Sequence, residues 1–115
     1  MNRIGMIVVL LALVAGVAVR AGGAADRVIE ITAKRFEYQP AEVHVRAGEP
    51  IVFALRSLDR QHGFSLPDFH LRTDIPAGAT VRLPWTPTTR GHFEFSCDVY
   101  CGSGHEGMSG TLIVE

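Results

Sequence analysis

The sequence predicts an all-β domain that folds as a two-sheet, Greek-key sandwich. From Arg27 onward, apolar residues recur at every second position in short runs bounded by glycine, proline or aspartate, a pattern typical of strands with one buried face. No ten-residue stretch after Asp26 keeps a helical period. Six or seven such strands bury their apolar faces most economically when two sheets pack together.

Six segments carry the clearest strand pattern, and turn residues separate several of them. The expected strands are residues 28–33, 42–46, 50–57, 79–85, 91–97 and 110–114, with turns at 47–50 and 76–78. Within these strands, the large apolar side chains expected in the core are Phe53, Trp85, Phe93 and Phe95. Phe93 and Phe95 share a strand face with Cys97, so the core-facing side of that strand leads directly into the segment beyond it.

Residues 1–25 differ from the rest of the chain and predict an export segment. Arg3 precedes an apolar run over 4–19, and Arg20 and small residues follow it. As a helix this run would span about 24 Å, less than the roughly 30 Å hydrocarbon core of a membrane. It therefore forms an N-terminal hydrophobic helix that is either a cleaved signal peptide, with Asp26 as the mature start, or an uncleaved membrane anchor. Either way, residues 26–115 form a single domain in the periplasm or on the outer face of the cytoplasmic membrane.

The composition excludes several functions. The formal net charge is −1, and the basic residues are scattered singly rather than clustered with aromatic residues, so no nucleic-acid surface is predicted. The sequence also offers no nucleophile with an adjacent base and no paired acid and base.

One short loop near the C-terminus concentrates soft metal ligands. Cys97, Cys101, His105 and Met108 are separated by three, three and two residues, so a tight loop can turn all four side chains toward one point. Thiolate and thioether sulfur favour copper, and imidazole also binds it. A structural zinc site is normally closed by cysteine and histidine alone, so Met108 favours copper over zinc.

A copper site built on this loop needs a further ligand from elsewhere, and His62 is the best candidate. It follows an expected strand and precedes Gly63, which allows close approach of the backbone. His44 and His92 each stand between inward-facing apolar residues and should face solvent. His70 lies in a loop and is a weaker candidate than His62.

With these residues in view, the chain resembles a known family, the copper A (CuA) domain of cytochrome c oxidase subunit II, a cupredoxin. The short bacterial subunits of the ba type are the most similar. The resemblance covers nearly all of residues 26–115 and rests on five motifs. They are Phe36 with Tyr38-Gln39-Pro40, Ala47-Gly48, His62-Gly63-Phe64, Gly91-His92-Phe93, and the spacing from Cys97 to Met108.

The resemblance implies a ligand set for a dinuclear centre of two copper ions. Cys97 and Cys101 would bridge the ions, and His62 and His105 would each terminate one of them. Met108 and the main-chain carbonyl of Val99 would be weak ligands, and the side chain at Val99 differs from the usual Glu or Gln. The acidic residue that often precedes the upstream histidine is Asp59 here, and its position leaves a hydrogen bond to His62 open.

The resemblance also implies partners for a non-catalytic electron-transfer subunit. The donor would be a cytochrome c or another small redox protein, and the acceptor would be the catalytic subunit of a haem-copper oxidase. Asp59, Asp98 and Glu106 are candidates for docking a basic cytochrome, or are ordinary solvated loop residues.

Three alternatives remain open from the sequence. Exported thiols commonly oxidise, so Cys97 and Cys101 could form a disulfide, and copper loading would then need a reductant and a copper chaperone. His62, Cys101, His105 and Met108 alone match a mononuclear blue-copper site. The same ligands could also serve a periplasmic copper carrier that has no oxidase partner.

Overall fold

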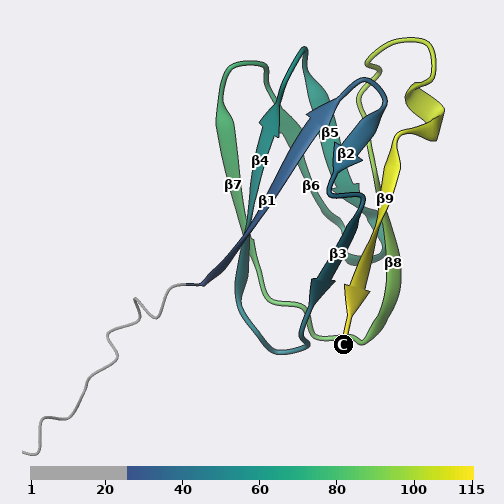
Figure 1. The fold of residues 1–115 in the computed structure, drawn as a ribbon. Helices are drawn as coiled ribbons and strands as arrows, with labels where there is room; N and C mark the ends of the chain where they lie inside the picture. Colours follow the sequence, from purple (N-terminus) through teal and green to yellow (C-terminus); the bar gives the residue numbers. More distant parts are fainter. Residues whose placement is uncertain (1–25) are drawn as a thin grey trace, which may run out of the picture.

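The structure, a computed structural model, describes residues 26–115 as a sandwich of two β-sheets (Figure 1). The predicted N-terminal hydrophobic helix lies outside the described residues. The strands are β1 Arg27–Lys34, β2 Glu37–Gln39, β3 Glu42–Val45, β4 Ile51–Ser57, β5 His62–Leu66, β6 Leu71–Ile75, β7 Thr80–Trp85, β8 Gly91–Ser96 and β9 Ser109–Val114. Two short 3₁₀ helices, η1 Pro67–Phe69 and η2 His105–Gly107, complete the fold. Within residues 26–115, no helix has both the length and the apolar character needed to cross a membrane.

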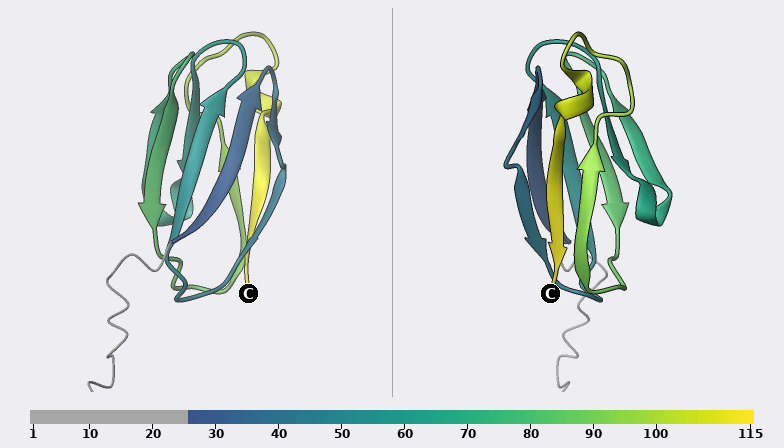
Figure 2. Two further views of the ribbon diagram at one scale, coloured as in Figure 1. Left: turned by 60° about the vertical axis from the view of Figure 1, so that its left-hand side comes forward. Right: turned by 90° about the vertical axis from the view of Figure 1, so that its right-hand side faces the viewer.

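The strands form one four-stranded and one five-stranded sheet. The first has the order β2-β1-β4-β7 and the second β3-β9-β8-β5-β6. Figure 2 shows the two sheets face to face, with the connection between β8 and β9 above them. Most neighbouring strands are antiparallel, but β1 pairs with β4 and β3 pairs with β9 in parallel. The all-β sandwich predicted from alternating apolar residues is confirmed.

All six expected strands are present, each within a residue or two of its predicted bounds, and three further strands appear. β2 has only three residues, too few to show a period. β5 is buried along nearly its whole length, so it does not alternate. β6 is an edge strand whose central residues Arg72, Thr73 and Asp74 are polar. Alternation of apolar and polar residue types is the clearest sequence sign of a strand, and the residue types of these three segments do not show it.

The core lies between the sheets and is rich in aromatic residues. Phe53 and Phe95 are fully buried, as predicted, and Phe64 packs against both rings with centroid separations of 5.0 and 5.1 Å. Trp85 and Phe93 are only partly buried, so their prediction as core residues needs correction. Both pack against the ring of Phe69, which is itself only partly buried, at the rim of the core.

Candidate metal centre

The predicted ligands come from two segments that meet at one end of the sandwich, here called the metal end. His62 begins β5, and residues 97–108, here called the ligand loop, connect β8 to β9. β8 pairs with both β5 and β9, so both segments emerge at the same end, opposite the C-terminus (Figure 1). The Cys97 amide donates to the Met108 carbonyl at 3.1 Å and closes the base of the loop.

The sulfur atoms gather in a compact cluster. The Cys97 and Cys101 Sγ atoms are 3.7 Å apart, and both cysteines are free thiols. Cys101 Sγ also lies 3.6 Å from His105 Nδ1 and 3.9 Å from Met108 Sδ. The Cys97 thiol donates to the Val99 carbonyl at 3.1 Å. The loop therefore turns all its predicted donor atoms inward, including the backbone oxygen.

His62 completes the cluster from the facing strand. One of its ring nitrogens and the two thiol sulfurs all lie within 4.8 Å of one another, the only such metal-ligand group among the described residues. The sequence analysis placed this histidine after an expected strand, and the structure puts it at the start of β5 with its side chain fully buried. The structure thus brings together all six predicted positions: His62, Cys97, Val99, Cys101, His105 and Met108.

The two nitrogens of the His62 ring have different surroundings. Nε2 is 2.6 Å from Asp59 Oδ1, whereas Nδ1 is buried with no hydrogen-bond partner. A buried, unpaired ring nitrogen is costly unless something occupies its lone pair. Nδ1 is therefore the nitrogen available to the thiol cluster, and a metal cation there would satisfy it. The donors present fit a soft metal ion.

Asp59 holds the outer side of the His62 ring, which settles the hydrogen bond that the sequence left open. Its carboxylate also accepts from the backbone amides of Arg35 at 2.8 Å and Arg60 at 2.7 Å. Burial alone would raise the pKa of Asp59, but hydrogen bonds from the Arg35 amide, from His62 and from the Arg60 amide outweigh it and hold that pKa well below its usual range. The ionised carboxylate orients the imidazole, a common support for metal-binding histidines.

Gly63 lets the ligand loop approach β5. A Cβ at this position would collide with the carboxylate of Asp98 and would lie 3.1 Å from Val99 Cγ2. The Gly63 amide donates to Cys97 Sγ at 3.3 Å, and the buried Tyr38 hydroxyl donates to the Gly63 carbonyl at 2.6 Å. The chain next to His62 is therefore fixed on both its amide and its carbonyl side.

Burial and thiol pairing keep Cys101 protonated in the metal-free protein. Desolvation, together with the hydrogen bond and charge of Cys97, raises the pKa of Cys101 to about 11. Because metals bind the thiolate, binding must release a proton from this residue. His105 is less enclosed: it is half-buried, and its ring lies 5.9 Å from that of the exposed Tyr100, centroid to centroid.

The other histidines lie away from the cluster. His44 and His92 are exposed on the outer face of the five-stranded sheet, as alternation predicts, and both flank Ile113 of β9. His70 is exposed and follows η1. None of the three belongs to the group of candidate metal ligands found among residues 26–115.

Two arginines that sequence reasoning missed contact the ligand loop. Arg60 Nη1 donates to the Cys101 carbonyl at 2.9 Å. Arg72 forms a two-point ion pair with Asp98, with contacts of 2.5 and 3.0 Å, and the pairing with Asp98 and Asp74 raises its pKa further above its usual high value. Asp59 and Asp98, proposed from sequence as docking acids, are thus engaged within the protein. No local signal identifies these contacts, because the paired residues lie far apart in the sequence.

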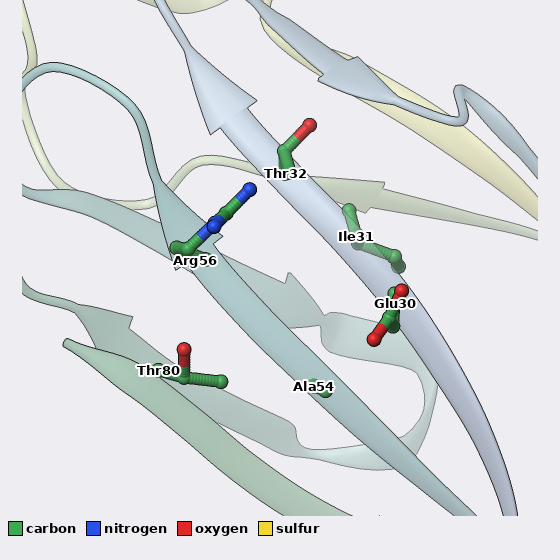
Figure 3. Close-up of a pocket in the computed structure, with 6 residues that line it drawn as sticks. All are labelled: Glu30, Ile31, Thr32, Ala54, Arg56 and Thr80. Carbon is green, nitrogen blue, oxygen red and sulfur yellow. The ribbon is translucent and has the colours of Figure 1, made fainter.

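A shallow pocket of about 210 Å³ lies elsewhere, on the outer face of the four-stranded sheet (Figure 3). Its lining residues are Glu30, Ile31, Thr32, Ala54, Arg56 and Thr80. None of them is a candidate metal ligand, so this pocket plays no part in the site.

Comparison with known proteins agrees with the sulfur-rich donor set. A cupredoxin-like domain model matches residues 4–114, which is nearly the whole chain. The chain belongs to the cupredoxin-like domain family. This assignment and the cysteine, histidine and methionine donors together support copper as the metal.

This cupredoxin-like domain is similar to cytochrome c oxidase subunit 2 of Thermus thermophilus, with 32% identity over 87 residues. The match covers 76% of the chain but 64% of that protein, so the chain spans less than two thirds of this relative's length. An alternative cytochrome c oxidase subunit 2 of Bradyrhizobium diazoefficiens is 32% identical over 74 residues, which are 64% of the chain and 27% of that protein.

A solved structure shares the fold. It is the periplasmic domain of cytochrome oxidase subunit II from Bradyrhizobium japonicum, with a TM-score of 0.72 and 22% identity. The alignment covers 78% of the chain and 84% of that structure. Similarity at this identity concerns the sandwich architecture.

Proposed function

We propose that this cupredoxin-like domain binds two copper ions and transfers single electrons. It would act as the subunit II of a cytochrome c oxidase, the part that accepts electrons from the donor. The carrying observation is the buried, unpartnered Nδ1 of His62 beside two thiol sulfurs 3.7 Å apart. Two sulfurs at this separation can be shared between two cations. His62 and His105 would each hold one ion, with Met108 and the Val99 carbonyl as weaker ligands.

The ligand cage suits electron transfer better than substrate chemistry. A pair of copper ions that share two thiolates would store one electron with little change in bond length. The protein keeps this geometry because His62 is fixed by Asp59 and the loop base is closed by the bond between Cys97 and Met108. His62, Cys101 and Met108 are buried, so solvent reorganisation around the donor atoms is small.

The half-buried His105 and the exposed Tyr100 beside it mark the side from which an electron would arrive. The donor would be a cytochrome c or another small redox protein, and the acceptor a haem in the catalytic subunit of a haem-copper oxidase. Among the acids predicted to dock a basic donor, Asp59 and Asp98 are engaged within the protein. Glu106 is the remaining candidate of the three.

Export is supported by the similarity to a periplasmic domain of subunit II and by the sequence of the N-terminal segment. Residues 1–25 would be a signal peptide or a membrane anchor, and residues 26–115 the domain, located in the periplasm or on the outer face of the cytoplasmic membrane. Free thiols 3.7 Å apart are prone to oxidation in such a compartment. Copper loading would therefore require a thiol reductant and a copper chaperone.

A mononuclear blue-copper site, in an electron carrier or a copper carrier, is the second candidate. One observation favours it: His105 Nδ1 and Met108 Sδ both approach Cys101 Sγ. A single ion could use these three residues and His62. This arrangement leaves the buried thiol of Cys97 without a role.

Copper content, measured together with electron spin resonance, tests the proposal. The reduced chain is loaded with copper, freed of excess metal and analysed for copper per polypeptide. We expect two ions per chain and the hyperfine pattern of one electron shared equally by two copper nuclei. A single ion with the pattern of one nucleus would support the mononuclear alternative, and absence of bound copper would reject both.

A further inference from the structure

Arg60 places a positive charge on the ligand loop from a separate segment of the chain. It lies in the turn between β4 and β5, two residues before His62, and its guanidinium Nη1 donates to the Cys101 carbonyl at 2.9 Å. Its backbone is fixed on both sides. Asp59 Oδ1 accepts from the Arg60 amide at 2.7 Å, and the Ser57 hydroxyl donates to the Arg60 carbonyl. The charged group is therefore held at a defined place.

The ligand loop has a matching opening at Gly102. This residue has φ +129°, a conformation that side chains rarely adopt. A Cβ at Gly102 would lie 3.4 Å from Arg60 Nη1 and 3.5 Å from the ring of Phe36. The guanidinium and the aromatic ring thus lie close to the backbone at Gly102, where the positive φ, and not a lack of space, disfavours other residues. The hydrogen bond to the Cys101 carbonyl keeps the Arg60 guanidinium close to Cys101.

We propose that Arg60 is a positioning residue that raises the reduction potential of the copper centre through its fixed positive charge. This rests on the proposed function, because it assumes that Cys101 binds copper. Reduction adds one electron to the centre and, with no proton taken up, makes it more negative by one charge. A nearby cation stabilises this reduced state relative to the oxidised one. Arginine keeps its charge across the physiological pH range.

The opposing charge comes from Asp59. Its carboxylate carries hydrogen bonds from His62 and from the Arg35 and Arg60 amides, and it favours the oxidised state. No ion pair to the Arg60 guanidinium occurs among residues 26–115. The electric field of the Arg60 guanidinium at the ligand loop is therefore not cancelled by a direct ion-pair partner. Because Arg60 is largely exposed, water and salt weaken this field without removing it.

A redox titration of copper-loaded full-length chains tests this role, with ferrocyanide as the one-electron donor and ferricyanide as the acceptor. The variants are Arg60→Gln, Arg60→Lys and, as control, Arg82→Gln, which alters an exposed arginine of β7 in the other sheet. We expect Arg60→Gln to shift the electron-transfer equilibrium about tenfold toward the oxidised form, which is about 59 mV for a one-electron couple. Arg60→Lys should retain part of the wild-type value, and Arg82→Gln all of it.

Two further measurements distinguish an effect of the Arg60 charge on the potential from a structural change at the copper centre. Copper per chain and the hyperfine pattern should be the same in all variants, and the gap between wild type and Arg60→Gln should narrow as potassium chloride is added. An unchanged potential in Arg60→Gln, an equal loss in Arg60→Lys, or loss of copper from Arg60→Gln would overturn the proposal. If the wild-type chain binds no copper, it is instead the proposed function that fails.

Discussion

His62 and the ligand loop reach the metal end by different means. His62 begins β5, where it pairs with Ile75 of β6 and is fully buried. The ligand loop has no partner strand between Cys97 and Met108, and several of its residues are exposed. Its inner backbone bonds are short-range contacts around η2, and its links to the rest of the protein are side-chain contacts. The sheet thus preorganises one ligand, whereas side chains from distant segments, among them Arg60 and Arg72, contact the loop that carries the others.

Substitution of either cysteine in the ligand loop should have the largest effect. Cys101→Ser should abolish any dinuclear centre, because one thiolate cannot replace the shared pair of sulfurs, and copper per chain should fall to one or less. Cys97→Ser should also remove the shared-electron signal but leave Cys101, His105, Met108 and His62 for a single ion. Metal analysis with electron spin resonance distinguishes these results. A shared-electron signal that persists in either variant would contradict the bridging roles.

Asp59→Asn tests how His62, the ligand supplied by β5, is held in place. The substitution keeps the shape of the side chain but removes the charge that orients His62 through Nε2. Loss of such an outer hydrogen-bonding partner typically lowers metal affinity about 10- to 100-fold, and we expect a decrease in this range. Competition with a copper chelator of known affinity measures it. The exposed Asp68→Asn in η1 is the matched control. Wild-type affinity in Asp59→Asn would show that the strand alone holds His62.

Arg72→Gln should have the smallest effect, and it tests how the ligand loop is attached to the rest of the protein. It removes the two-point pair with Asp98, but both side chains are substantially exposed. Water therefore screens the pair, and its loss should lower the free energy of unfolding by less than about 1 kcal/mol. Chemical denaturation of the metal-free protein measures this change. Hydrogen exchange should meanwhile speed up at the amides of residues 98–104. A much larger loss of stability would mean that Arg72 supports the sheet and not only the loop.

The sequence predicted the parts of the molecule that depend on local patterns. Alternating apolar residues placed six strands, and the spacing from Cys97 to Met108 indicated a single ligand loop. β5 was missed because its buried residues do not alternate, so His62 was predicted as a ligand but not as the first residue of a strand. Alternation identified Phe53 and Phe95 as core residues but could not show that Trp85 and Phe93 reach only the rim. How deeply a core-facing side chain is buried depends on what the facing sheet places over it, which alternation does not reveal.

The contacts that hold the metal end together depend on tertiary structure. Arg60 reaches a carbonyl 41 residues away, and Arg72 reaches an acid 26 residues away. A long, flexible side chain can select among many acceptors, and sequence spacing does not reveal which one it meets. The hydrogen bond between Asp59 and His62 is local, yet it depends on the geometry of the turn between β4 and β5. Residue types therefore predicted the ligands better than the residues that position them.

Both ends of the described chain lie far from the metal end. β1 begins beside the start of β4, and the last residue, Glu115, bonds to Val45 and Ala47 at the opposite end of the sandwich (Figure 1). A surface attached through Glu115 would consequently leave the predicted copper ligands directed toward the solution. Tethering the protein to an electrode by a C-terminal linker would present Tyr100 and His105 to a dissolved redox partner. Direct contact between the metal end and the electrode would require the molecule to reorient by about half a turn.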